Sequence, residues 1–135
     1  MKAQEITFTT KDGTILDGRG FQTNNSHTLM LLFLGLGGNA RSKAVEYFAS
    51  SLAKKGVSTV VFSARGHGDS EGLFEFDMHK SDILELEKKY SVIAKKNKVS
   101  FVVTGHSMSG HAMVLSKLSS DVILLSPGLF HSHPK

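Results

Sequence analysis

The chain has 135 residues, about the length of one ordinary domain, and 40% of them are hydrophobic. With 21% charged residues and a net charge of +4, the composition is typical of a folded globular protein and excludes a disordered one. The sequence contains no cysteine, which excludes a disulfide framework and a thiolate metal site. We therefore expect a single domain over residues 1–135.

The lysines are spread over several predicted helices, so the positive charge indicates solvated helix faces and we expect no nucleic-acid partner. The longest apolar stretch, residues 29–36, is much shorter than the roughly 20 residues that span a bilayer, so we expect no membrane span. The N-terminus lacks the apolar region of a signal peptide. Together these features predict a cytoplasmic protein.

The first elements along the chain are two half-buried strands. Apolar and polar residues alternate in "EITFTT" (5–10) and "TILDGRGFQT" (14–23), and the turn signal "KDG" lies between them. This pattern predicts an antiparallel hairpin that forms one edge of a sheet.

From residue 28 the pattern changes to continuous apolar runs, at 28–35, 58–64, 100–105 and 121–126. Such runs are typical of parallel strands that are covered on both faces. The segments between them have helical spacing. The first stripe contains Val45, Phe48, Ala49, Leu52 and Ala53, the second contains Ile83, Leu86, Tyr90 and Ile93, and a third helix is expected from Met108 to Leu118. Strands that alternate with helices predict an α/β fold with a mostly parallel sheet and helices on both faces.

The segment "FVVTGHSMSG" (101–110) leads from a strand through a serine into a helix. Small residues around Ser107 permit the sharp turn that presents a nucleophile at the end of a sheet. The helix that begins at Met108 directs its N-terminal amides, and the positive end of its dipole, toward any oxyanion formed there.

A glycine-rich turn follows the first parallel strand, in "FLGLGGNA" (33–40). Its backbone is expected to bring the amide of Leu36 close to the amide of Met108, and this pair would form an oxyanion hole. The polar, glycine-rich segment 63–72 follows the next strand and is expected to border the same site.

In these three segments the sequence resembles the α/β-hydrolase family, in particular the branch of monoacylglycerol lipases, lysophospholipases and serine aminopeptidases. The resemblance covers the whole chain as the N-terminal portion of that fold, without its C-terminal strands. It implies the strand order 1-2-4-3-5-6, Ser107 as nucleophile, Leu36 and Met108 as oxyanion donors, and acyl transfer to water. The sequence departs from the family pattern at three positions: Leu34 replaces a histidine, Ser63 an aspartate and Ser109 a glycine.

The family's catalytic histidine and acid follow later strands and have no counterpart here. Asp121 opens the last strand and is expected at the end of the sheet away from Ser107. His131 and His133 leave the correct end and are candidate bases, but no carboxylate in the tail would hold either in one tautomer.

The remaining polar residues near the site favour structural roles. We expect His106 to support the serine turn, His111 to lie on the helix behind it and His67 to be a turn residue. Asp69 and Glu71 are interpreted as turn and helix-entry residues. The histidines and carboxylates have no metal-ligand spacing, so we predict no metal and no cofactor.

Two other interpretations remain open. "GLGGNA" also fits a dinucleotide-binding fingerprint, with Arg65 placed to meet the 2′-phosphate of NADP, although Ser63 stands where an acidic residue is expected. Alternatively, the chain is a noncatalytic protein that binds a ligand or a partner. An unpaired edge on the last strand would favour self-association or a C-terminal partner chain.

The interpretation that accounts for all three segments is a serine hydrolase of carboxylic ester, thioester or amide bonds, with small acyl esters as substrates. Because the family's acid and histidine have no counterpart here, this interpretation leaves open whether the chain is active alone.

Overall fold

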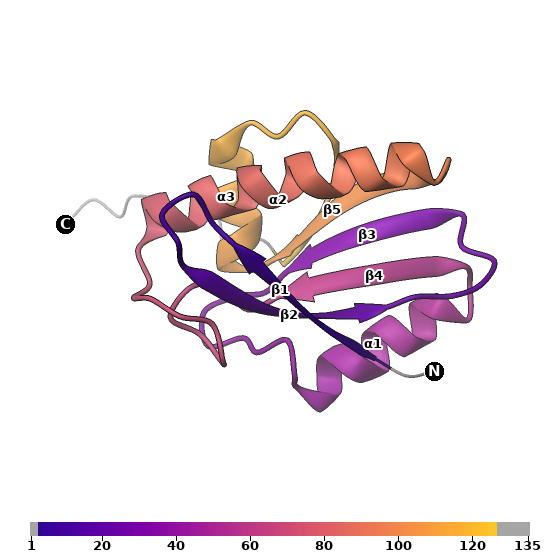
Figure 1. The fold of residues 1–135 in the computed structure, drawn as a ribbon, viewed down its shortest axis with the longest axis horizontal. Coiled ribbons are helices and arrows are strands. Elements are labelled where there is room, and N and C mark those ends of the chain that lie inside the picture. Colours follow the sequence, from indigo (N-terminus) through magenta and orange to yellow (C-terminus); the bar gives the residue numbers. More distant parts are fainter. Residues whose placement is uncertain (1–2, 127–135) are drawn as a thin grey trace.

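Six strands form one mixed sheet in the computed structural model, which describes residues 3–126 (Figure 1). The strands are β1 (Gln4–Thr9), β2 (Ile15–Phe21), β3 (Thr28–Phe33), β4 (Val57–Phe62), β5 (Ser100–His106) and β6 (Asp121–Leu125). Their order across the sheet is β1-β2-β4-β3-β5-β6, which confirms the order that the family resemblance implied.

The N-terminal hairpin is antiparallel, as the alternating pattern predicted, and β2 also pairs antiparallel with β4. The other pairs are parallel, with β3 at the centre between β4 and β5. In this register Phe33 lies opposite both Phe62 and Gly105, so three strands end at the same level of the sheet. The loops that follow these three strands therefore begin side by side.

Helices cover both faces, with α1 (Lys43–Ala53) on one side and α2 (Phe76–Lys96) and α3 (Met108–Ser116) on the other (Figure 1). Ser42 caps α1 by accepting a hydrogen bond from the Val45 amide at 3.2 Å. The α2 helix starts at Phe76, seven residues before the apolar stripe that predicted it. Glu71 consequently lies in the loop before the helix, where its amide donates to the Ile15 carbonyl at 2.8 Å.

The β6 edge of the molecule carries large apolar side chains that are exposed. They are Val114 and Leu115 on α3 and Val122, Ile123 and Leu125 on β6. Among the described strands β6 pairs with β5 alone, so its outer edge is open. No helix in residues 3–126 is long and apolar enough to cross a membrane, and the cytoplasmic location remains a prediction.

Candidate active site

The backbone at Ser107 has an unusual conformation. This residue is the sole link between β5 and α3, and its dihedral angles are φ 55° and ψ −120°. For a residue with a side chain, this positive-φ conformation costs of order 1–3 kcal/mol, and it persists only where the surrounding structure imposes it. Gly105 supplies part of that constraint, since a Cβ there would lie 2.9 Å from the Gly110 Cα. The small residues around Ser107 therefore allow α3 to pack directly against β5.

The glycine-rich turn after β3 lies against Ser107. The amide of Gly38 donates to the carbonyl of Gly35 at 2.9 Å, and Gly37 has φ +79°, which favours glycine at the third position of the turn. A Cβ on Gly35 would lie 3.0 Å from the Cβ of Ser107. The side chain of Leu36 is 62% exposed. The structure thus brings the predicted segments 33–40 and 101–110 together.

The first turn of α3 provides amides without partners inside the helix. The carbonyl of Ser107 accepts the first such bond, from the His111 amide at 3.3 Å, so the amides of Met108, Ser109 and Gly110 precede the ladder. Leu36 and Met108 therefore lie in the two segments that flank Ser107. Their use as oxyanion donors remains a prediction.

The sequence analysis missed one buried residue near the site, His79 on α2. Its Nε2 lies 2.9 Å from Oγ of Ser109, which is fully buried and donates a hydrogen bond to the carbonyl of Leu34. Burial, with smaller contributions from His67 and Arg65, lowers the pKa of His79 to about 4. The sequence did contain a signal that His79 is buried, because positions 79, 83, 86 and 90 continue the helical spacing of the apolar stripe.

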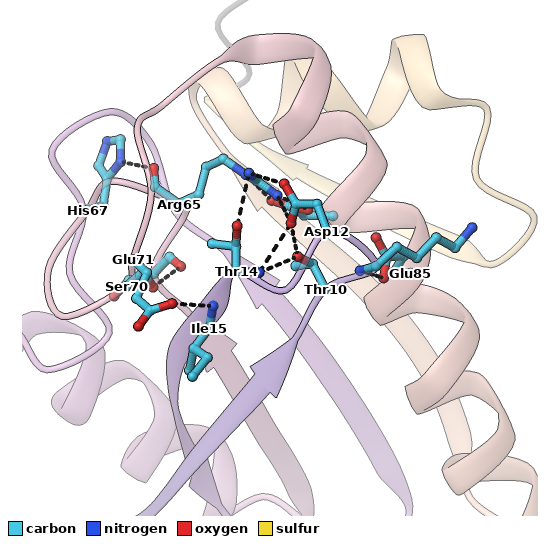
Figure 2. A network of polar contacts seen from close by, with 12 residues as sticks. Thr10, Asp12, Thr14, Ile15, Arg65, His67, Ser70, Glu71 and Glu85 are labelled. Atoms are coloured by element: carbon cyan, nitrogen blue, oxygen red, sulfur yellow. Dashed lines mark hydrogen bonds and ion pairs between the residues drawn. The ribbon is translucent and has the colours of Figure 1, made fainter.

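Arg65 lies in a buried ionic cluster rather than at an open ligand site. It donates from Nε and Nη2 to both oxygens of Asp82, each at 2.9 Å, and from Nη1 to Asp12 at 2.9 Å (Figure 2). The hydrogen bonds that Arg65 donates to Asp82 and Asp12 raise the pKa of Arg65, while burial raises the pKa of Asp82 against the influence of Arg65. The guanidinium is thus already bound by two carboxylates, which argues against the alternative in which Arg65 meets a 2′-phosphate.

The loop after β4 is held by several further contacts. Ser63 is buried, and its Oγ accepts a hydrogen bond from the Ala40 amide at 2.8 Å, which joins this loop to the glycine-rich turn. Nδ1 of His67 lies 3.2 Å from the Arg65 carbonyl oxygen, and its ring packs edge-on against Phe74, consistent with a turn residue. Figure 2 shows Glu71 beside Ile15, whose amide donates to its carboxylate at 3.1 Å.

The candidate bases fall into two groups. His131 and His133 lie outside the described residues. Among residues 3–126, the ring nitrogens of His27, His67 and His79 form hydrogen bonds with groups other than the Ser107 hydroxyl. Asp121 is at the far end of β6 from Leu125, whose carbonyl accepts from the Ser107 amide at 3.0 Å.

Two other features bear on ligand binding. Residues 3–126 contain no group of three histidine or carboxylate side chains placed to hold a metal ion. A hollow of about 460 Å³ lies between the start of β4 and the end of α2, lined by residues such as Ser58, Tyr90 and Asn97. It is at the opposite end of the sheet from Ser107 and has no charged side chain in its lining.

The family model described as serine aminopeptidase, S33, matches residues 26–133. No curated protein sequence matches the chain significantly. Among solved structures, the chain resembles the α/β hydrolase GrgF from Penicillium sp. sh18, with a TM-score of 0.78 and 15% identity over 94% of this chain and 46% of that one.

Two further structures give a similar result. XC6422 from Xanthomonas campestris, described as an α/β serine hydrolase without lid, has a TM-score of 0.73 and 19% identity over 97% of this chain and 65% of that one. A monoglyceride lipase from Saccharomyces cerevisiae has a TM-score of 0.68 and 22% identity over 81% of this chain and 36% of that one. The chain thus spans less than two thirds of each structure. By its fold and its family match, this chain belongs to the S33 serine aminopeptidase family of α/β-hydrolases.

Proposed function

We propose that the chain carries the nucleophile of a serine hydrolase that cleaves carboxylic ester, thioester or amide bonds, with small acyl esters as substrates. The observation that carries the proposal is the backbone of Ser107, held at φ 55° between β5 and α3 with Gly35 against it. Strained backbone of this kind clusters at active sites, where it fixes a reacting group.

The reaction begins when Oγ of Ser107 attacks the substrate carbonyl and transfers its proton to a general base. The carbonyl oxygen then becomes an oxyanion, which the amides of Leu36 and Met108 stabilise as donors on either side of the serine. The tetrahedral intermediate collapses as the base returns the proton to the leaving alcohol, thiol or amine. Water next attacks the acyl-serine and releases the carboxylic acid and free Ser107.

The general base of this proposal lies outside residues 3–126. His131 and His133 are candidates, because they follow the end of β6 that contacts Ser107. The alternative is a histidine supplied by a second copy of the chain at the outer edge of β6. The exposed apolar side chains of β6 and α3 favour this second source.

The direct test is labelling of the purified chain with a fluorophosphonate probe. We expect labelling of the wild type, none of Ser107→Ala, and unchanged labelling of Ser116→Ala, a control serine on the same helix whose Oγ donates to Ala112. A variant with both His131 and His133 changed to alanine separates the two sources of the base.

Loss of labelling in the double histidine variant would assign the base to the tail. Retained labelling, together with an oligomeric mass, would assign it to a second chain at the β6 edge. A folded wild-type chain without labelling would contradict catalysis by this chain alone and would favour a noncatalytic protein that binds a partner.

A further inference from the structure

Three elements meet at the buried hydroxyl of Ser109. Ser109 belongs to the first turn of α3, His79 to the first turn of α2, and Leu34 follows the last residue of β3. Oγ of Ser109 contacts both of the others, as donor to the Leu34 carbonyl and at 2.9 Å from Nε2 of His79. One hydroxyl thus connects the two helices to the start of the glycine-rich turn.

The hydrogen bonds at this junction indicate which nitrogen of the His79 ring carries the proton. A serine hydroxyl has one proton, which goes to the Leu34 carbonyl, so its lone pair accepts from Nε2–H of His79. In the neutral ring Nδ1 is then unprotonated, and among the described residues it has no hydrogen-bond partner. The ring packs against Phe33 and Phe74, an environment that favours the neutral form.

The carbonyl held by this junction belongs to the residue before Gly35. Gly35 makes the close approach to Ser107, and the amide predicted to bind the oxyanion is that of Leu36, the next residue. A shift of the Leu34 carbonyl would therefore move the turn relative to the serine. Leu34 and Ser109 are also two of the positions at which the sequence departs from the family pattern, and they contact each other.

We propose that Ser109 and His79 are positioning residues, which hold the Leu34 carbonyl and thereby fix the glycine-rich turn against Ser107. The catalytic consequence rests on the function proposed above. The positioning itself does not, because it concerns hydrogen bonds that form in the free protein.

The first measurement is the tautomer of His79 in the full 135-residue chain, read from long-range ¹H–¹⁵N spectra of the imidazole rings at pH 7. We expect a neutral ring protonated at Nε2. A neutral ring protonated at Nδ1 would overturn the proposal, because Nε2 would then have no proton to donate to Ser109. This measurement needs no variant and no activity.

The second measurement is hydrogen exchange of the Gly38 amide, which is bonded to Gly35 inside the turn. Ser109→Ala removes one hydroxyl from a buried site, and we expect Gly38 to exchange about fivefold faster or more. Ser116→Ala removes a similar serine-to-carbonyl bond elsewhere on α3 and should leave Gly38 unchanged. Equal exchange in Ser109→Ala and wild type would overturn the positioning role.

A pair of variants at His79 tests whether the donor itself matters. His79→Leu removes the ring donor and should speed Gly38 exchange, whereas His79→Gln retains an N–H donor at similar reach and should restore part of the protection. The same rate in both variants would contradict the role of His79. Missing labelling of Ser107 in the wild type would contradict catalysis by this chain alone and leave these exchange results standing.

Discussion

Two buried polar clusters meet on α2, and they are built in opposite ways. One is neutral, with His79 hydrogen-bonded to Ser109 beside the serine turn. The other is ionic, with Asp82 one helical turn further along and bonded to Arg65, whose side chain is 6% exposed. The neutral cluster holds backbone that approaches Ser107 closely, whereas the ionic cluster ties the β1–β2 turn and the loop after β4 to the helix.

The difference lies in what remains when one partner is removed. A neutral donor or acceptor left alone in the interior costs about 1–3 kcal/mol, while a buried charge without its partner costs about 3–5 kcal/mol. The stability contributed by the ionic cluster therefore depends more strongly on keeping both charged partners. The stability contributed by the neutral cluster depends more strongly on pH and on how closely the elements pack.

The largest expected effect is that of breaking the ionic cluster. Arg65→Met would leave the Asp82 carboxylate, 3% exposed, without its bidentate partner, and we expect the free energy of unfolding to fall by about 3–5 kcal/mol. Urea denaturation measures this change. Lys80→Met is the control, because its ion pair with Asp77 is exposed, and we expect a change below about 1 kcal/mol. Similar losses of unfolding free energy in both variants would contradict the distinction between the buried and the exposed ion pair.

The pH dependence of stability should identify the neutral cluster. The pKa of His79 is lowered from 6.5 to about 4, chiefly by burial, with smaller electrostatic contributions from His67 and Arg65. Between these values the unfolded chain binds more protons than the folded one, so stability falls as pH decreases from about 6.5 to about 4. The shift corresponds to about 3 kcal/mol over this range.

The His79→Gln variant isolates that contribution, because glutamine does not titrate. We expect the wild type to lose stability relative to His79→Gln as the pH is lowered from 6.5 to 4. A constant difference across this range would show that His79 titrates normally in the folded chain.

A smaller effect is expected from the close packing beside the neutral cluster. Gly105→Ala would place a Cβ 2.9 Å from the Gly110 Cα and 2.3 Å from the Met113 sulfur, so we expect a loss of about 1–3 kcal/mol. Gly20→Ala is the matched control on β2, where the nearest atom to a Cβ is 3.8 Å away and little change is expected. Thermal unfolding compares the two, and equal stabilities would refute the packing argument.

Much of the fold could be predicted from local patterns. The alternating hairpin and the continuous apolar runs identified all six strands, and the three predicted helices are present. The start of α2 was missed because His79 and Asp82 interrupt the hydrophobicity of its first turns, although both are buried. From sequence alone, a buried polar residue is predicted to lie on the surface, because its hydrogen-bonding partner is not known.

The sequence by itself determined the sheet and the turn at Ser107, because strand burial and small residues at a tight turn are local requirements. Only the tertiary structure decided which polar groups pair around that turn. Ser109 and Leu34 are 75 positions apart, and Arg65 and Asp12 are 53 apart. Hydrogen bonds and ion pairs form over about 3 Å, so they depend on how the β3 end, the loops and the helices pack together, and residue spacing along the chain does not specify that.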